Sequence, residues 1–307
     1  MTNPQFSKVN LSETLRGAQL AALPQSAIRL LELSQDASNG PAEFAVPIES
    51  DPGLAGQVLR FVNSSYFGFS REISSVKLAI TLVGIRTIKN FALWSAVFSL
   101  MPNPKCGPFD LKSLWQDSLR RALFARAMAK LLGMKEAEEV FAAALLQDMA
   151  VPLLAKELPA AYATLLSARC HGQYRLSLLE QHGFGWNHAQ AAGIMARQWN
   201  LPETFAVLIE GHLEIERWID QPESEPGQRA VALSALLPTA ADPLWTDRER
   251  FETCYQKLRC GEEPGAAELL EQIDQEFVDF APVLKVARPS KSLVDAYRES
   301  QEASAAT

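Results

Sequence analysis

Apolar residues recur at helical spacing along almost the whole chain, and this periodicity is the feature that most limits its fold. In residues 24–34, for example, Ile28, Leu30, Leu31 and Leu33 follow a proline start. No stretch of useful length alternates apolar and polar residues, as a half-buried β-strand requires. The sequence therefore predicts an all-α protein.

Proline, glycine and capping residues divide this pattern into separate helices. Asp51-Pro52 supplies an N-cap oxygen and a first-turn proline. Gly84 and Gly133 are placed to end helices, and Pro152 separates two of them. We expect a loop over residues 101–108, a linker or long loop over 220–228, and helices over 24–34, 52–62, 74–84, 85–98, 111–132, 136–149, 152–168, 176–182, 188–199, 203–216, 229–237 and, as a pair, 246–280.

Composition limits the class of protein. The chain has 307 residues, enough for one large domain or two small ones, and 48% are hydrophobic against 21% charged. These values are typical of a globular protein. The formal charge of −7 repels polyanions on average, so nucleic-acid binding is disfavoured.

Cysteine usage and the absence of long apolar stretches indicate the compartment. Four cysteines occur without a CxxC pair, which is typical of a reduced protein rather than a disulfide scaffold or zinc ribbon. The N-terminus lacks the order of a signal peptide, and the apolar run from Phe91 to Met101 is too short to span a bilayer. We expect a cytoplasmic protein without a membrane partner.

Few residues could support chemistry, because no phosphate loop, nucleophile elbow or zinc-binding HExxH motif occurs. Any acid–base or metal site must draw on His171, His182, His188 and His212. His212 follows Leu208 by four residues, which predicts a place on the buried stripe of its helix. Asp148 interrupts the apolar run AAALLQDMAVPLL, so it should be buried and in need of a partner.

Two interpretations of these residues stay open. One carboxylate and two imidazoles on three helices suit a divalent metal such as Fe, Mn or Zn. Alternatively, the histidines are hydrogen-bonded core residues, and Asp148 pairs with backbone N–H groups or with Arg120 or Arg121.

Two further segments have alternative interpretations. Residues 260–280 contain seven acids and no Lys or Arg, which indicates a solvated acidic face. Residues 71–90 contain four bases, one acid and the helix pair around Gly84, which imitates a DNA-binding helix-turn-helix. The apolar residues of its second helix leave little polar face for a groove, so DNA binding is the least favoured function.

The run LP…LLEL…IESDPGLAGQVLRFVNSSYFGFSREISSVKLAITLVGIRTIKN resembles the HDOD family, bacterial signalling relatives of HD-domain phosphohydrolases. The later strings AALLQDMAVPLL and E…FGWNHAQAAGIMARQWNLPETFAVLIEGH resemble the same family in the right order. The resemblance covers about residues 16–220. It implies an N-terminal helical half, residues 16–100, packed on an HD-like bundle, residues 109–220. Residues 1–15 would then be a lead-in, 229–290 a C-terminal helical extension, and 291–307 a flexible tail.

The motif of HD hydrolases can be placed on this chain residue by residue. Its first histidine corresponds to Asp117, and its His-Asp pair to Gln147 and Asp148. A later histidine corresponds to His188, and the first of a further pair to His212. The final aspartate corresponds to Ser234, which cannot ligate in the same way. The resemblance therefore implies metal ligands at Asp148, His188 and His212, with Asp117 as a fourth candidate.

This incomplete ligand set implies loss of catalysis, because metal-assisted hydrolysis needs an ion held with open positions. We expect a non-catalytic signalling module that contacts other signalling proteins, without a required cofactor. A metal-dependent phosphohydrolase with a reduced ligand set is the alternative. In the family signature, Asp51, Asn63 and Ser64 have structural roles as caps and helix exits, or else the segment NSSYFGFS presents its aromatic residues to a partner.

Overall fold

The structure, a computed structural model, describes residues 9–18, 20–135, 137–221, 224–243, 245–259 and 264–305. Within these ranges every regular element is an α-helix, so the predicted all-α class is confirmed. Parts of the predicted lead-in (1–8), acidic run (260–263) and tail (306–307) lie outside the described residues. The helices are α1 Leu11–Gly17, α2 Gln25–Leu33, α3 Pro41–Glu49, α4 Pro52–Val62, α5 Val76–Val83, α6 Ile85–Leu100, α7 Leu111–Leu131, α8 Ala137–Leu146, α9 Ala150–Glu157, α10 Pro159–Ala168, α11 Leu176–Phe184, α12 His188–Gln198, α13 Glu203–Glu210, α14 Ile215–Asp220, α15 Pro226–Ser234, α16 Arg248–Leu258, α17 Ala266–Phe280 and α18 Leu293–Ala305.

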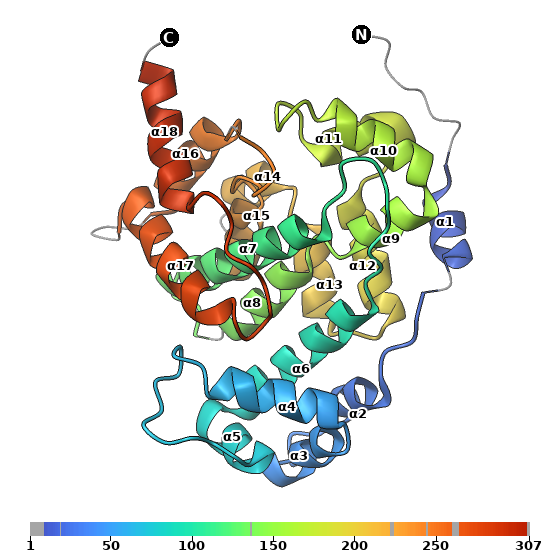
Figure 1. Cartoon of the computed structure of the whole chain (residues 1–307), viewed down its shortest axis with the longest axis vertical. Coiled ribbons are helices and arrows are strands. Elements are labelled where there is room, and N and C mark those ends of the chain that lie inside the picture. Colours follow the sequence, from blue (N-terminus) through green and yellow to red (C-terminus); the bar gives the residue numbers. More distant parts are fainter. Residues whose placement is uncertain are drawn as a thin grey trace.

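Helix α7 is the central element of the larger group of helices. Figure 1 shows α2–α5 gathered at one end of the molecule, with α6 leading from them toward the remaining helices. Helix α7 packs against α8, α15 and α17, and α6 packs against α8. Because α7 is covered on several sides, even polar residues on it, such as Gln116, Arg120 and Arg126, are buried. These buried polar groups require partners on the neighbouring helices.

Local signals set α4 and α5 as predicted, whereas α1 and α3 lie where no helix was predicted. The Asp51 carboxylate accepts a hydrogen bond from the Leu54 N–H and caps α4 (3.1 Å). Helix α5 ends at Gly84, whose φ of 98° suits glycine. The Asn63 side chain bonds both the N–H and the carbonyl of Ile73 (2.7 and 2.8 Å), which ties together the loop between α4 and α5. The structural interpretation of Asp51 and Asn63 is consistent with these contacts.

Three predicted boundaries were wrong. Pro152 lies inside α9, where it is tolerated because first-turn N–H groups have no intrahelical partner. The break falls instead at Leu158, immediately before Pro159. The predicted helix 203–216 is two helices, and His212 lies in the turn between α13 and α14. Helix α15 begins at Pro226, within the predicted linker 220–228.

The predicted flexible tail and solvated acidic face also need correction. Residues Leu293, Val294 and Tyr297 of α18 are buried, so the segment after Lys291 begins with a packed helix. Asp274 of the acidic run accepts hydrogen bonds from the N–H groups of Leu293 and Val294 (both 2.9 Å). The acidic helix α17 is therefore half-buried on the bundle, with several acids engaged in specific contacts.

Two polar side chains of α7 hold the chain between α17 and α18. Gln116 donates to the Ala287 carbonyl (2.8 Å), and Arg120 donates to the Lys291 carbonyl. Both side chains are buried, so these contacts replace hydrogen bonds that water would otherwise provide. Residues 266–297 thus pack directly against the HD-like bundle.

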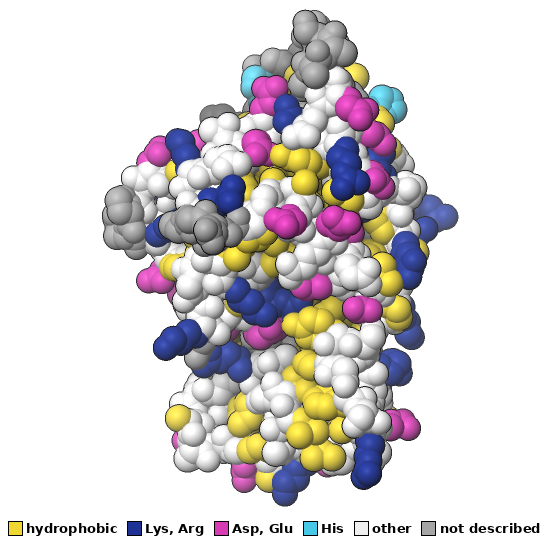
Figure 2. Space-filling model, turned by 90° about the vertical axis from the view of Figure 1, so that its left-hand side faces the viewer, with side chains coloured by type: hydrophobic (Ala, Val, Ile, Leu, Met, Phe, Trp, Pro, Cys, Tyr) yellow, Lys and Arg dark blue, Asp and Glu magenta, His cyan; other side chains and the backbone are white. Residues whose placement is uncertain are grey.

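The surface of the N-terminal half bears on the alternatives left open above. Helix α6, the second helix of the apparent helix-turn-helix, buries every residue from Asn90 to Val97, so this stretch cannot enter a groove. Among the exposed apolar side chains are Val46 on α3 and Leu78 and Leu82 on the neighbouring α5. Figure 2 shows apolar side chains gathered on the lower part of one face. Among the described helices, none is long and apolar enough to cross a bilayer.

Candidate functional site

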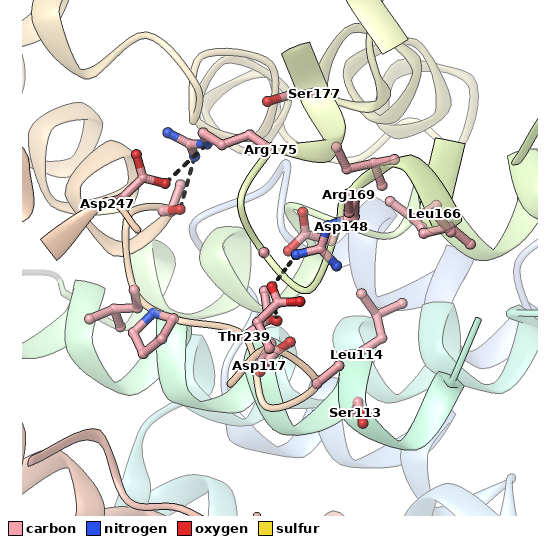
Figure 3. Close-up of a pocket in the computed structure, with 18 of the residues that line it drawn as sticks. Ser113, Leu114, Asp117, Asp148, Leu166, Arg169, Arg175, Ser177, Thr239 and Asp247 are labelled. Carbon is pink, nitrogen blue, oxygen red and sulfur yellow. Dashed lines mark hydrogen bonds and ion pairs between the residues drawn. The ribbon is translucent and has the colours of Figure 1, made fainter. Parts of the chain in front are cut away.

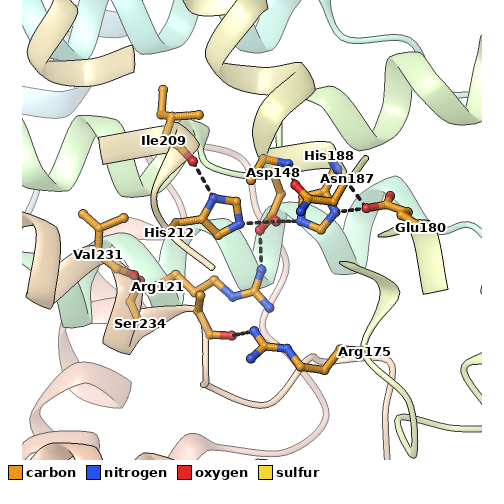
Figure 4. Close-up of polar contacts among 12 residues, drawn as sticks. Arg121, Asp148, Arg175, Glu180, Asn187, His188, Ile209, His212, Val231 and Ser234 are labelled. Carbon is orange, nitrogen blue, oxygen red and sulfur yellow. Dashed lines mark hydrogen bonds and ion pairs between the residues drawn. The ribbon is translucent and has the colours of Figure 1, made fainter. Parts of the chain in front are cut away.

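Asp148, His188 and His212 converge although they lie on separate elements. Asp148 is in the turn between α8 and α9, His188 begins α12, and His212 follows α13. The Nε2 atoms of His188 and His212 lie 3.3 and 3.8 Å from Oδ1 of Asp148, and all three ligand atoms are within 4.8 Å of one another. All three residues are buried. The structure therefore brings together these three predicted ligands (Figure 4).

Hydrogen bonds to the far side of each imidazole determine which nitrogen faces the cluster. His212 Nδ1 lies 2.6 Å from the Ile209 carbonyl and must donate to it, so Nε2 carries the lone pair. That Nε2 atom is buried without a hydrogen-bond partner among the described residues. A lone pair facing a carboxylate oxygen is unfavourable unless a cation lies between them, so the three residues fit a divalent metal ion.

Glu180 is a buried member of the cluster that the sequence analysis missed. Its carboxylate accepts hydrogen bonds from Tyr162 Oη (2.6 Å), the His188 N–H (2.8 Å) and His188 Nδ1 (2.6 Å). A carboxylate that orients a histidine in this way is the usual outer partner of a metal ligand. Buried positions 177, 180 and 184 of α11 share one stripe, so an acid interrupting that stripe was the available signal.

Arg121 is the main charge partner of Asp148. Its Nη1 donates to Oδ2, which leaves Oδ1 facing the histidines. Of the two arginines considered from the sequence, Arg121 is thus the partner, whereas Arg120 binds the Lys291 carbonyl. Burial alone raises the pKa of Asp148, but Arg121 and His188 outweigh burial and hold that pKa well below its usual value.

The two histidines differ in protonation. Burial lowers the pKa of His188, but Glu180 and Asp148 outweigh burial and raise it to about 9. Burial lowers the pKa of His212 to about 3, against the attraction of Asp148. Without a metal, His188 is thus an imidazolium between two carboxylates, and His212 is neutral.

Asp117 does not join the three ligands. Its Oδ1 accepts the Ala240 N–H (2.7 Å), and its carboxylate is absent from the described group whose ligand atoms converge. Ser234 is likewise occupied locally, since its hydroxyl donates to the Val231 carbonyl (2.7 Å). His171 and His182 are exposed and away from the cluster. The prediction of a fourth ligand at Asp117 therefore gains no support from the geometry.

A cavity of about 160 Å³ adjoins the cluster. Its size suits a small ion or a single ring, since a cavity of about 150 Å³ takes up benzene. Figure 3 shows polar side chains reaching it from α7, from the segment before α11, and from the chain after α15. The polar lining includes Asp117, Arg121, Asp148, Arg169, Arg175, Ser177, His188, His212, Thr239, Asp242 and Asp247.

The substitution Asp117→Asn tests whether burial of the Asp117 carboxyl group lowers the stability of the fold at neutral pH. Burial raises the pKa of Asp117 from 3.8 to about 7, against the attraction of Arg121. Because the folded state favours the protonated form, it loses stability as pH rises from about 4 to 7. Asp117→Asn should therefore be more stable than the natural protein at pH 8, on the order of 2–4 kcal/mol, and similar at pH 4. Urea denaturation at both pH values measures the difference in free energy of unfolding between Asp117→Asn and the natural protein. An equal difference at pH 4 and pH 8 would contradict the raised pKa of Asp117.

Gln147, at the position of the lost histidine, is fully buried, and neither amide atom has a hydrogen-bond partner in the described part of the chain. Unsatisfied polar atoms of this kind cost about 1–3 kcal/mol each, whereas an apolar side chain of similar shape does not incur this cost. Gln147→Met should raise the free energy of unfolding by about 1–2 kcal/mol. Chemical denaturation tests this, and lower stability in the variant would indicate a bond to the Gln147 amide.

The helical fold and the buried carboxylate–imidazole cluster together define an HD-like helical domain. The HDOD domain model matches residues 20–215, which is more than half of the chain. The chain therefore belongs to the HDOD family, as its motifs predicted.

Solved structures share the fold. An HDOD domain protein of unknown function from Geobacter sulfurreducens has a TM-score of 0.71 at 20% identity, covering 90% of this chain and 97% of that chain. A protein from Shewanella amazonensis named as a candidate phosphohydrolase has a TM-score of 0.62 at 20% identity, covering 94% and 97%. A candidate signal transduction protein from Marinobacter aquaeolei has a TM-score of 0.60 at 20% identity, covering 92% and 65%.

A curated relative is considerably longer than this chain. The chain is 22% identical over 220 residues to an uncharacterized protein from Treponema pallidum, which amounts to 69% of this chain and 42% of that protein. The match thus spans less than half the length of that relative.

Proposed function

We propose that this chain is a non-catalytic HDOD signalling module that acts through contacts with other signalling proteins in the cytoplasm. The observation that carries the proposal is the charge balance at Asp148. Its carboxylate is already paired with Arg121 on Oδ2 and lies 3.3 Å from His188 on Oδ1. A carboxylate compensated by two cationic groups holds a metal ion less strongly than a free one, and hydrolysis requires a firmly held ion.

The surface of the N-terminal half supports a role in protein contacts. Val46, Leu78 and Leu82 are 65%, 45% and 48% exposed on two helices that pack against each other. Apolar side chains grouped on a surface are typical of interaction sites. Within the segment NSSYFGFS, by contrast, Tyr66 and Phe67 pack against the core, and Phe69 is 38% exposed, so we place the contact on α3 and α5.

A hydrolysis assay tests the proposal. The purified protein should not turn over phosphomonoesters or cyclic dinucleotides with Mg, Mn, Fe or Zn. Turnover that disappears in Asp148→Ala would overturn the proposal. An Asp110→Asn variant is the control, because residue 110 caps α7 at the edge of the same cavity and asparagine caps equally well.

A second candidate is a metal-dependent phosphohydrolase with a reduced ligand set. The unpartnered Nε2 of His212 favours it, as does the support of His188 by Glu180. Elemental mass spectrometry of untagged protein separates the candidates. About one Fe, Mn or Zn per chain, lost in both His188→Ala and His212→Ala, would favour the hydrolase.

A further inference from the structure

The segment that joins α10 to α11 has an unusual backbone. Cys170, His171 and Gly172 all have left-handed φ values, 48°, 57° and 95°. Such values are unfavourable for residues with a Cβ atom and normally occur singly rather than in succession. A Cβ at Gly172 would lie 2.8 Å from the Asp242 side chain, so only glycine fits there. The surrounding contacts must hold this segment in place.

Those contacts cross to the chain that follows α15. At one end of the segment Arg169 pairs with Asp242, and at the other Arg175 Nε lies 3.5 Å from Asp247 Oδ2. Between them, the Thr246 hydroxyl donates to the Gly172 carbonyl (3.0 Å). Both chain segments, the one between α10 and α11 and the one after α15, line the cavity beside the Asp148 cluster (Figure 3). Residues 169–175 are thus fastened across the cavity by an ion pair at each end.

Three guanidinium groups share this cavity: those of Arg121, Arg169 and Arg175. The Nε–H groups of Arg121 and Arg169 are buried without a partner in the described part of the chain. Burial lowers the pKa of Arg175, and Arg250 and Arg121 lower it further against the attraction of Asp247. Two of these three guanidinium groups therefore keep an N–H donor that no bond within the described residues satisfies. Figure 4 shows Arg121 and Arg175 close together.

The counterions of these arginines are carboxylates of the same chain. Guanidinium groups bind phosphate and carboxylate in the same bidentate manner, so a free anion could replace a side-chain carboxylate. Asp242 and Asp247 have side chains 10% and 25% exposed, and both would regain water if the two segments separated. Exchange of one carboxylate for another anion would therefore leave no buried charge unpaired.

We propose that residues 169–175 form a gate over this cavity, and that a small anion carrying phosphate or carboxylate groups opens it by displacing Asp242 and Asp247 from Arg169 and Arg175. The cavity volume of about 160 Å³ suits an ion of this size. The proposal concerns ligand entry and does not depend on partner binding or on hydrolysis.

Calorimetric titration of the full chain tests displacement directly. Asp242→Asn removes the competing carboxylate, so it should bind inorganic phosphate or malonate at least about tenfold more tightly than the natural protein. Arg169→Gln should weaken the same binding at least about tenfold. Separate titrations with the two anions show whether phosphate or carboxylate is preferred. Glu203→Gln is the control, because its partner Arg197 is exposed and outside the cavity.

Hydrogen exchange tests the movement. Millimolar phosphate or malonate, whichever binds, should raise exchange in peptides covering residues 169–175, and Asp242→Asn should raise it without added anion. Asp247→Asn provides a second variant if Asp242→Asn melts much earlier by circular dichroism. The gate is disproved if folded Asp242→Asn binds neither anion more tightly, or if exchange in this segment is unchanged in both experiments.

Discussion

Replacement of Arg126 by alanine is expected to lower the free energy of unfolding by about 3–5 kcal/mol, one of the two largest effects expected for a single substitution in this protein. Arg126 is 2% exposed, and its guanidinium lies 4.7, 4.9 and 5.2 Å from the ring centroids of Tyr66, Phe141 and Phe280. A cation–π contact of a desolvated arginine is worth about 2 kcal/mol or more.

The Arg126 side chain contacts the helical bundle, the C-terminal helix α17 and the N-terminal half through ion pairs and ring contacts. Arg126 on α7 hydrogen-bonds Glu276 on α17 (2.8 Å) and lies 3.7 Å from Glu138. Tyr66 belongs to the N-terminal half, and Phe280 to α17. Removal of the guanidinium leaves a cavity among the rings and two carboxylates without their cation. The substitution should therefore loosen the C-terminal helices and the N-terminal half together.

Urea denaturation measures this effect, and Arg197 provides the control. Arg197 pairs with Glu203 and Glu210 at 2.9 and 2.8 Å, but its side chain is 39% exposed. Arg197→Ala should cost less than about 1 kcal/mol. Arg126→Met keeps most of the volume without the charge, so it separates packing from electrostatics. A loss below about 1 kcal/mol in Arg126→Ala would contradict the central role of this residue.

Asp148→Asn is expected to lower the free energy of unfolding by about 3–5 kcal/mol at pH 7 in metal-free protein. Arg121 and His188 would both lose the charge that compensates them in a buried site. The pKa of Asp148 is well below its unfolded value of 3.8, so its contribution is present in full at pH 7 and is lost only as pH falls below about 4.

The sign of this result bears on function. In a site held open for a metal, carboxylate ligands repel nearby lone pairs, and their removal from the metal-free protein raises stability. In a cluster whose carboxylate is neutralised by an arginine of the same chain, removal of that carboxylate lowers the stability. Urea denaturation in the presence of a chelator decides between the two, with Asp110→Asn as a control that should change stability by less than about 1 kcal/mol. A more stable Asp148→Asn variant would favour the phosphohydrolase.

Local signals predicted most of the helices, because caps and breakers act within a few residues. Asp51, Gly84 and Gly133 end or begin helices near the predicted positions. Errors arose where packing decides the boundary. The turn at His212 interrupts a pattern that reads as one helix, and the Trp218 ring lies so close to Gly211 that a Cβ there would be 2.9 Å away. Helix α18 was not predicted because its sequence is mostly polar, although Leu293, Val294 and Tyr297 are buried.

The candidate site was predictable in part. Asp148 interrupts an apolar run of the sequence, and Glu180 interrupts the buried stripe of α11. Both belong to the cluster, although only Asp148 was considered. Arg169 and Arg175 carry no comparable signal, because their role depends on Asp242 and Asp247, more than 70 residues further along the chain. Pairing over such a separation follows from the arrangement of the helices and not from the residues between the partners.

The order of residues thus suffices to establish an all-helical HDOD protein with Asp148, His188 and His212 as its candidate ligands, since helical periodicity and sequence motifs are local properties. The packing of the helices decides the rest. Adjacent residues Arg120 and Arg121 point to different partners because successive positions on a helix face directions about 100° apart. Asp117, one helical turn before Arg121, lies on nearly the same face of α7, but the chain after α15 supplies the Ala240 N–H to its carboxylate, which does not join the ligands.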